Sequence, residues 1–236
     1  MNGLLLINKP VGITSFDCIR HLKKLLPPKT KIGHSGTLDP FASGLLVIGI
    51  GKATQSLNTG LDLDKTYIVK IKLGELTDTL DQTGTITQSS NYTAENIDFA
   101  AWAKKLMPEY HQTPPLYSNV KFNGQALHRI MRAGTMSEEQ VQEVAQERSK
   151  LCKILEFSVI ETAPPFVTFI ARVSKGTYIR SLANDIAIQG GTVATVYELM
   201  RTAIGNITLQ KAVSIEKFTN RMDIEDKIIE KDLFLI

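Results

Sequence analysis

A clean alternation of apolar and polar residues over positions 66–73 is the feature that most constrains the fold. The apolar side chains take every second position, at Tyr67, Val69, Ile71 and Leu73, and Lys70 and Lys72 lie between them. Because successive side chains of a strand point to opposite faces of its sheet, this spacing predicts a strand with one buried face. Half-buried strands of this kind are typical of antiparallel sheets.

Other segments predict further strands and helices. Residues 3–7, 45–50 and 167–173 are apolar or β-rich runs that we expect to form strands. Thr14 has capping-box spacing to Asp17, and Thr177 is placed to cap a second helix. Residues 97–107 favour a helix, and residues 137–148 favour a short helix or a mobile segment. Because strands and helices are interspersed without a regular order, we predict an α+β fold with a mixed, mainly antiparallel central sheet and flanking helices. No repeat or linker divides the chain, so we expect one domain over residues 1–236.

Several functional classes are disfavoured by the sequence. The longest apolar runs are too short to span a bilayer, and the N-terminus lacks the features of a signal peptide, so we expect a cytoplasmic protein without membrane contact. Two distant cysteines and four scattered histidines fit no metal-ligand spacing, which predicts reduced thiols and no metal. Residues 49–54 resemble a phosphate-binding loop, but Leu46 and Ala53 break that pattern, so no nucleotide cofactor is expected.

Basic residues gather near the N-terminus although the net charge is only +3. Residues 1–31 contain a single acid, Asp17, and six basic residues, namely Lys9, Arg20, Lys23, Lys24, Lys29 and Lys31. Such a cluster could follow the phosphates of a nucleic acid, or it could be a solvated helix face. Charge alone leaves both interpretations open. A second basic patch lies within residues 112–136, at Lys121, His128, Arg129 and Arg132.

Residues 30–44 are rich in Gly, Ser, Thr, Asp and Pro, which predicts an irregular loop. Loops of about fifteen residues without secondary structure are usually functional or disordered. Pro40 disfavours helical backbone at Asp39, so the carboxylate of Asp39 would be presented from an extended segment. A lone Asp in a turn is, however, more often a turn-forming residue than a catalytic one.

The sequence resembles the bacterial TruB-type tRNA pseudouridine synthases from Gly3 to about Gly205. Seven separated motifs carry the resemblance in the family's order: Asn8-Lys-Pro-Val-Gly-Ile-Thr-Ser, Gly33-His-Ser-Gly-Thr-Leu-Asp-Pro-Phe-Ala-Ser-Gly, Gly51-Lys-Ala-Thr, Asp64-Lys-Thr-Tyr67, Thr77-Asp-Thr-Leu-Asp81, Gln112-Thr-Pro-Pro-Leu-Tyr-Ser and Lys175-Gly-Thr-Tyr-Ile-Arg180. The resemblance implies a pseudouridine synthase fold. It also implies isomerisation of uridine 55 in the T loop of tRNA, by base flipping, cleavage of the glycosidic bond, rotation of the base and formation of a C-glycoside.

The resemblance assigns three catalytic residues. Asp39 matches the catalytic aspartate, which acts as a nucleophile or takes a proton from the ribose. Arg180 matches the arginine that pairs with this aspartate and keeps it ionised. Tyr67 matches the tyrosine that stacks on the target base, although its position in the sequence is equally that of a core aromatic residue.

Further residues match substrate-binding positions of the family. His34 matches the histidine that fills the space left by the flipped base, and Tyr178 and Leu199 match residues that line the pocket. Asp81 and Lys9 are expected to contact the RNA. An RNA-contacting insertion is expected at about 112–150.

Some positions depart from the family pattern. Gln55 stands where a basic residue is usual, Thr195 replaces a common His, and Met200 replaces the first of two arginines, leaving Arg201 alone. We therefore expect a weaker basic grip on RNA there. About thirty residues follow Gly205, which predicts no C-terminal PUA domain and hence recognition of the T arm with little help at the acceptor stem. We also expect a monomer that needs no protein partner. The alternatives are a guide-dependent enzyme like Cbf5 and a tRNA-folding protein that acts without catalysis.

Overall fold

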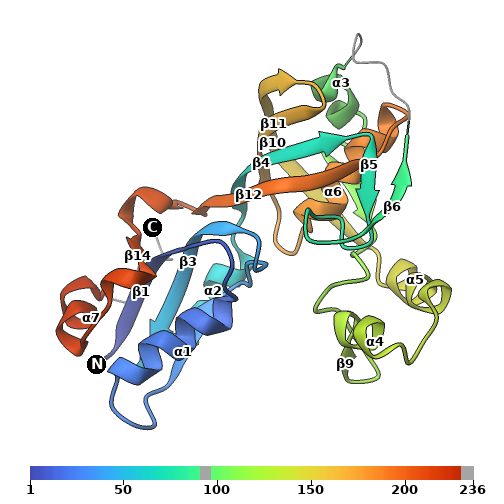
Figure 1. Ribbon diagram of the computed structural model, residues 1–236. Coiled ribbons are helices and arrows are strands. Elements are labelled where there is room, and N and C mark those ends of the chain that lie inside the picture. Colours follow the sequence, from blue (N-terminus) through green and yellow to red (C-terminus); the bar gives the residue numbers. More distant parts are fainter. Residues whose placement is uncertain (91–96, 230–236) are drawn as a thin grey trace. The chain divides into compact units, whose positions relative to one another are not determined.

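The computed structural model describes residues 1–90 and 97–229. These residues form two compact units, the first made of residues 1–68 and 199–229 and the second of residues 69–90 and 97–198. Two strands, β4 (Lys65–Leu73) and β12 (Ala194–Ile204), have residues in both units. Each unit is described below on its own (Figure 1). The single domain predicted from the sequence stays a prediction.

The sheet of unit 1 is built around the strands β1 (Gly3–Lys9) and β3 (Ser43–Ile50), which pair antiparallel. Its strand order is β14-β1-β3-β12, where β14 (Val213–Ser214) and β12 are the parallel neighbours. A short strand, β2 (Ile32–Ser35), also pairs antiparallel with β3. The prediction of a buried strand at residues 45–50 is confirmed.

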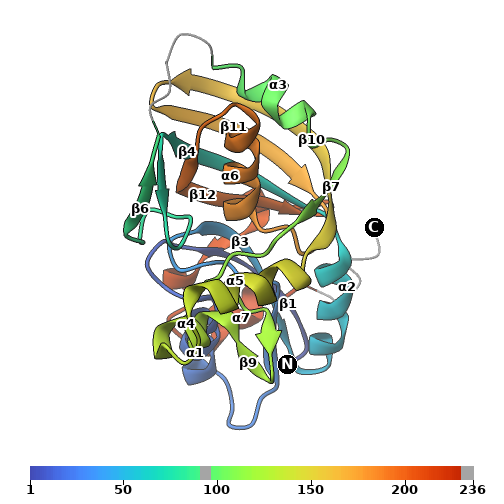
Figure 2. The same cartoon turned by 90° about the vertical axis from the view of Figure 1, so that its right-hand side faces the viewer.

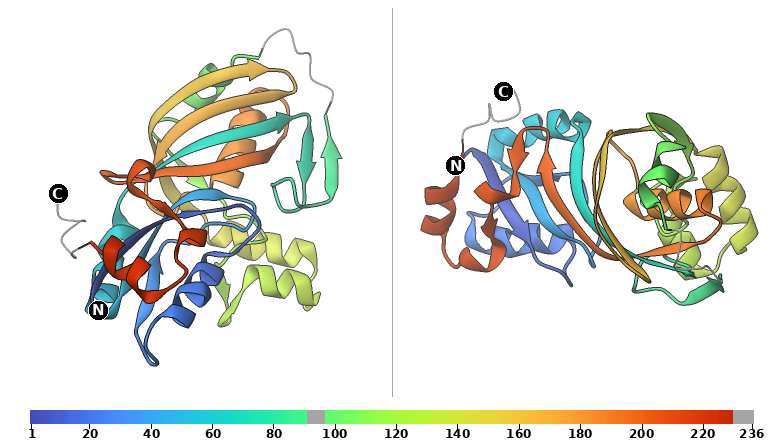
Figure 3. Two further views of the ribbon diagram at one scale, coloured as in Figure 1. Left: turned by 60° about the vertical axis from the view of Figure 1, so that its left-hand side comes forward. Right: turned by 90° about the horizontal axis from the view of Figure 1, so that it is seen from above.

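Both faces of β1 and β3 are buried, which explains why their sequences are continuous apolar runs. Alternate residues, among them Leu5, Ile7 and Ile48, pack under helix α1 (Ser15–Leu25). The residues between them, such as Leu4 and Val47, pack against Leu57 at the start of helix α2 (Leu57–Asp62). Figure 3 (right) shows α1 and α2 on opposite sides of these strands. The two helices thus cover the two faces of β1 and β3.

Helix α1 begins as the sequence predicts. Thr14 and Asp17 form a reciprocal capping box, and Ile19 and Leu22 are buried in the core. Phe16 is 56% exposed, and its ring lies 5.6 Å from the guanidinium of Arg20.

The irregular loop predicted for residues 30–44 is shorter than expected. Residues 32–35 form strand β2, and only residues 36–42 are irregular between β2 and β3. The glycines and short polar side chains hid this strand, because its order comes from pairing with β3 and from contacts with α1 and α2.

In unit 2 the strands follow the order β4-β11-β10-β7. The bounds are Phe166–Val173 for β11, Lys150–Ala163 for β10 and Glu109–Gln112 for β7. Every second residue of β4 is buried, including Val69 and Ile71, as the alternation predicts. Helices α3 (Phe99–Lys104) and α6 (Ile179–Gln189) lie on the same side of these strands (Figure 3). The mixed, mainly antiparallel α+β fold is thus confirmed.

An aromatic cluster joins α3 to the sheet of unit 2. The ring of Phe99 lies 5.8 Å from Trp102 and 5.4 Å from Phe169, and the rings of Phe157 and Phe169 lie 5.0 Å apart. Aromatic pairs at these separations add to the stability gained from burial alone. The cluster fixes one end of α3, which in turn packs against α6.

The segment expected to be an insertion has a small core of its own. It contains the hairpin strands β8 (Lys121–Phe122) and β9 (Gln125–Ala126) and the helices α4 (Leu127–Ala133) and α5 (Glu138–Glu147). The two helices lie side by side in Figures 1 and 2. Leu127, Ile130, Val141, Val144 and Ala145 are buried between them. Residues 137–148 therefore form a helix with a buried face.

A buried amide positions the start of α6. The side chain of Gln112 accepts a hydrogen bond from the Tyr178 N–H at 2.7 Å and donates to the Tyr178 carbonyl at 3.0 Å. Gln112 also donates to the hydroxyl of Tyr110, which donates to Asp185 at 3.1 Å. The helix begins after Tyr178, and Thr177, which was expected to cap it, donates to the Ser174 carbonyl instead. Gln112 of β7 thus holds the residue at which the helix begins.

The described residues after β12 add β13 (Ile207–Thr208) and α7 (Arg221–Lys227) to unit 1, besides β14. Two hairpin strands of unit 2, β5 (Glu75–Thr77) and β6 (Ile86–Ser89), flank the polar turn predicted at residues 78–84. Cys18 and Cys152 are free and buried, as predicted. Within residues 1–90 and 97–229, no helix combines the length and the apolar character that crossing a membrane requires.

The core under α1 can be tested with Leu22→Ala. Leu22 is fully buried against the sheet of unit 1, and a truncation of this kind costs about 2–5 kcal/mol of the free energy of unfolding. Urea unfolding should show this loss. Lys24→Ala, on the exposed face of the same helix, should change the free energy of unfolding by no more than about 0.5 kcal/mol.

The network that holds α6 predicts a pH dependence of stability. Burial raises the pKa of Asp185 from 3.8 to about 6, against the opposing hydrogen bond from Tyr110. The folded state then binds a proton that the unfolded state releases, so this group's contribution to stability is lost as the pH rises from about 4 to about 6. Asp185→Asn keeps an acceptor for Tyr110 and has no such titration. The melting temperature of the wild type should therefore fall relative to Asp185→Asn over this range, and a constant difference would contradict the assignment.

Candidate active site

The loop that carries Asp39 is short and rigidly attached to its surroundings. Asp39 is half-buried, and its neighbours Leu38, Phe41 and Ala42 are buried in unit 1. The hydroxyl of Ser15, itself buried on α1, accepts the Leu38 N–H at 2.8 Å and donates to the Leu38 carbonyl at 3.2 Å. This double contact fixes the peptide units next to the carboxylate.

Two backbone hydrogen bonds complete the shape of the loop. The Gly12 N–H donates to the Pro40 carbonyl at 2.8 Å, and the Ala42 N–H donates to the Asp39 carbonyl at 3.1 Å. The first bond ties the loop to the turn that follows β1. The backbone on both sides of the Asp39 side chain is therefore held without help from a ligand.

Arg201 closes the loop from the other side. Its side chain is 1% exposed, its Nε donates to the Leu45 carbonyl at 2.8 Å, and its NH2 group donates to the Gly36 carbonyl at 3.1 Å. Gly44 has a φ of +106°, and a Cβ there would lie 2.3 Å from the Arg201 carbonyl oxygen. Only glycine allows β3 and β12 to approach so closely. Arg201 is therefore a buried support of the loop, and the weaker basic grip on RNA expected at this place stays a prediction.

Lys9 lies beneath the same loop. Its ammonium is fully buried and donates to the carbonyls of Pro10 at 2.9 Å and Ile13 at 2.7 Å. Burial lowers its pKa from 10.5 to about 8; the charge of Arg201 adds to this effect, whereas Cys18 and Asp39 oppose it. These contacts stabilise the turn after β1. The RNA contact predicted for Lys9 is left without structural support, because its only polar contacts in the described structure are internal.

His34 lies on β2, opposite Ile48 of β3. Burial and the nearby charge of Arg201 lower the pKa of its imidazole, whereas the Gly36 backbone raises it, and the result lies below the usual 6.5. The ring is therefore mainly neutral at pH 7. Its Nδ1 atom is buried and has no hydrogen-bond partner among the described residues.

Tyr67 and Leu199 complete the predicted residues of unit 1. Both are largely buried, Tyr67 on β4 at 9% exposure and Leu199 on β12 at 6%. The structure places them in strands whose backbone is held by the sheet. Their roles in stacking and pocket lining stay predictions.

Arg180 and Asp81 come together in unit 2. The guanidinium of Arg180, 5% exposed, donates to the carbonyls of Thr79 at 2.7 Å and Tyr117 at 3.0 Å. It lies 3.8 Å from Asp81, whose carboxylate also accepts bonds from Thr79 and from the N–H and hydroxyl of Thr83. Asp81 therefore organises the turn at residues 78–84 that receives Arg180.

Tyr178 directly precedes α6, and its ring lies 5.1 Å from the ammonium of Lys150. Of the positions that depart from the family pattern, Thr195 is buried and joins β12 to β5 through bonds with Thr77 and Glu75. Gln55 is exposed in the short 3-10 helix (Gly51–Ser56). Thr195 therefore has a structural role within unit 2.

Three supporting residues lie in or near motifs of the family pattern, but their supporting contacts were not predicted. Ser15, Gln112 and Arg201 each bind backbone groups of segments distant in the chain, at separations of 23, 66 and 156 residues for Leu38, Tyr178 and Leu45. No local pattern marks such contacts. Within the part of the chain that the structure describes, no three His, Cys, Asp or Glu side chains are arranged to hold a metal ion.

Comparison with known proteins identifies close relatives. Residues 23–179 match the family model of the TruB family pseudouridylate synthase, N-terminal domain. A tRNA pseudouridine synthase B of Clostridium acetobutylicum is 38% identical over 232 residues, which cover 98% of this chain and 77% of the relative. The protein of the same name from Caldicellulosiruptor saccharolyticus is 40% identical over 230 residues, covering 97% and 75%.

Solved structures give the same fold. A chain of a Cbf5-Nop10-Gar1 complex superimposes with a TM-score of 0.66 at 26% identity, covering 97% of this chain and 57% of that one. A chain of the archaeal box H/ACA Nop10-Cbf5 complex does so with a TM-score of 0.66 at 21% identity, which shows the fold alone. From the family match and the relatives of similar sequence, the chain belongs to the TruB family of pseudouridylate synthases.

Proposed function

We propose that this chain isomerises uridine 55 in the T loop of tRNA to pseudouridine. The family match supports this activity, and so do relatives named tRNA pseudouridine synthase B that align over nearly the whole chain. The observation that carries the proposal is the Asp39 loop. Its backbone is fixed by Ser15, Gly12 and Arg201, so that one carboxylate is presented in a set position.

The reaction needs that carboxylate and a closed site. The bond between C1′ and N1 of the uridine breaks, the uracil rotates, and C1′ then bonds to C5. A proton leaves C5 and N1 gains one, so that the product is an isomer of the substrate. Asp39 either attacks C1′ or takes a proton from the ribose, and both routes use it as the ionised carboxylate. A fixed position lowers the entropic cost of either step.

Two further residues complete the proposed chemistry. As the family resemblance implies, Arg180 would act as the charged partner of the Asp39 carboxylate in the reaction. Its own position is set within unit 2 by the carbonyls of Thr79 and Tyr117. Tyr67 stacks on the target base, an interaction that contributes about 1–3 kcal/mol. Because the detached uracil must not escape, the apolar side chain of Leu199 and the ring of Tyr178 would line the pocket around it.

His34 would fill the space that the uridine leaves when it flips out of the RNA. Taking a base out of its stack costs a few kcal/mol. A mainly neutral imidazole can fill the vacated space at a lower desolvation cost than a charged one. Asp81 supports Arg180 in this scheme through the turn at residues 78–84. The helices of the insertion offer a further RNA contact through its basic residues.

The chain would act on the T arm as a cytoplasmic monomer, without a cofactor, a metal or a protein partner. A second candidate function is that of a guide-dependent enzyme, which the structural similarity to Cbf5 favours. The two differ in what they need. A stand-alone enzyme modifies a naked tRNA transcript, whereas a guide-dependent one requires an added guide RNA.

The test is to map pseudouridine in an unmodified tRNA transcript after incubation with the purified chain alone. Product at position 55 is expected from the wild type and none from Asp39→Asn, because the amide can neither attack nor accept a proton as the carboxylate does. Release of tritium from C5-labelled uridine measures the rate. Binding of the transcript should stay within about tenfold of the wild type.

Asp226→Asn, on the exposed face of α7, is the matched control and should keep full activity. Turnover by Asp39→Asn would show that another group carries the chemistry. A wild type that binds the transcript and makes no product without a guide RNA would favour the second candidate.

The support of the loop is tested with Arg201→Lys. A lysine has one ammonium and cannot reproduce the two bonds that Nε and NH2 make to Leu45 and Gly36. Hydrogen exchange at residues 36–45 should accelerate, and the single-turnover rate should fall at least about tenfold while tRNA binding changes little. Arg221→Lys, at an arginine paired with Glu225 on the surface of the same unit, should alter neither. An unchanged rate in a loosened loop would show that a fixed Asp39 backbone is not needed.

A further inference from the structure

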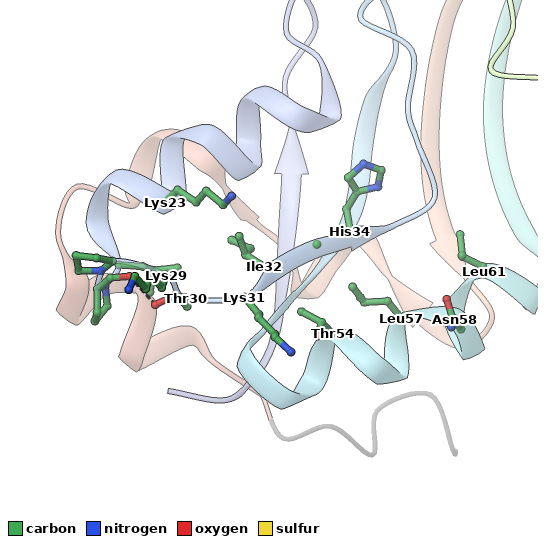
Figure 4. A pocket seen from close by; sticks show the side chains of 14 residues that line it. Lys23, Lys29, Thr30, Lys31, Ile32, His34, Thr54, Leu57, Asn58 and Leu61 are labelled. Carbon is green, nitrogen blue, oxygen red and sulfur yellow. Dashed lines mark hydrogen bonds between the residues drawn. The ribbon is translucent and has the colours of Figure 1, made fainter. Parts of the chain in front are cut away.

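A groove in unit 1 has no role in the chemistry above. It runs along β2, has a volume of about 590 Å³, and is lined by Lys31, Ile32, Gly33 and His34 (Figure 4). Residues at the end of α1 and in the following turn border it on one side. Thr54, Leu57, Asn58 and Leu61, from the short 3-10 helix and α2, border it on the other.

The groove lies at an open strand edge. Among the described residues β2 pairs with β3 alone, so its other edge keeps backbone N–H and C=O groups outside the ladder. An open edge of this kind offers hydrogen bonds to whatever lies along it. The groove therefore combines polar backbone groups with the side chains that border them.

Three exposed lysines give the groove a positive charge. Lys23 comes from α1, and Lys29 and Lys31 come from the turn between α1 and β2. Among the described residues that line the groove there is no Asp or Glu. In the described part of the chain none of the three lysines forms an ion pair, and Asp17, the single acid of residues 1–31, binds Arg20 and caps α1. Their charge is available to an anionic ligand.

The turn is built to present these lysines. Pro27 and Pro28 end the helix, and the Pro27 carbonyl accepts bonds from the N–H and the hydroxyl of Thr30. Lys29 has a φ of 65°, in the left-handed region that a lysine rarely adopts. A strained conformation at an exposed position often marks a functional site. With this backbone conformation, Lys29 lies in the turn that borders the groove.

His34 also lines the groove, five residues before Asp39 in the chain. Its buried Nδ1 atom has no hydrogen-bond partner among the described residues. Buried polar atoms are nearly always hydrogen-bonded. A ligand in the groove with a hydroxyl or phosphate group could supply the missing bond.

We infer that this groove binds the sugar–phosphate backbone of the tRNA substrate next to the modified uridine. The inference rests on the proposed function, and it adds a binding site to it. Lysines without acidic neighbours match a polymer with one negative charge per nucleotide, and the open backbone edge and His34 match its phosphate and ribose oxygens. An extended acidic peptide is the competing occupant, since it could pair with the edge of β2.

The triple variant Lys23→Ala, Lys29→Ala, Lys31→Ala tests the groove. Its Kd for an unmodified tRNA transcript should rise at least about tenfold at 0.1 M KCl, and the slope of log affinity against log salt should shrink by about 2. The single-turnover rate at saturating tRNA should stay within about twofold of the wild type, because none of the three lysines touches the Asp39 loop.

The matched control removes three exposed lysines of the same unit outside the groove, Lys24, Lys211 and Lys217. It should lose less affinity and keep more of the salt slope. Equal losses in the two triple variants would overturn the inference, as would a groove variant whose rate stays low at saturating tRNA. Binding of polyglutamate to the wild type that is lost in the groove variant, together with an unchanged affinity of the groove variant for tRNA, would assign the groove to an acidic peptide.

The affinity for tRNA is measured without turnover. The proposed activity and the proposed groove can therefore be disproved independently of each other. A wild type that forms no pseudouridine, yet loses affinity for tRNA only when the groove is changed, would overturn the activity and keep the groove. Product formation with an affinity that does not depend on the groove would do the reverse.

Discussion

The buried guanidinium of Arg201 is the interaction on which the arrangement of unit 1 depends. It donates to Leu45 at the start of β3 and to Gly36 at the end of β2, and so joins both ends of the segment that carries Asp39. A buried cation is costly unless its donors are used, and here the backbone carbonyls of the loop use them. The close approach at Gly44 brings Arg201 to this place. The loop geometry and the pairing of β12 with β3 therefore require each other.

The same device recurs in both units. Lys9 binds the carbonyls of Pro10 and Ile13, and Arg180 binds those of Thr79 and Tyr117. In each case a buried positive side chain takes backbone carbonyls as acceptors and fixes an irregular segment. Charge-assisted bonds of this type are stronger than neutral ones. They also place three of the chain's positive charges inside the protein.

Local patterns were sufficient for the regular elements. The alternation in β4, the capping box of α1 and the apolar run of β3 all formed as predicted, because each depends on neighbouring residues alone. Predictions that depended on distant partners fared differently. β2 was taken for loop, and the N-terminus of α6 is held by Gln112 and not by Thr177. The supporting role of Arg201 was not predicted, since only the folded sheet brings residue 201 to residues 36 and 45.

The sequence by itself determined the α+β class, the family and the candidate residues. Each of these follows from periodicity or from sequence motifs, which can be recognised without knowing any tertiary contact. Tertiary structure alone decided which polar residues face inward. Of the six basic residues before position 32, it buries Lys9 and arranges Lys23, Lys29 and Lys31 along one groove. The physical reason is that the charge of a side chain depends on that residue alone. Whether the side chain is buried, and whether it lies beside other charged side chains, depends on how distant strands pair and which helices cover them.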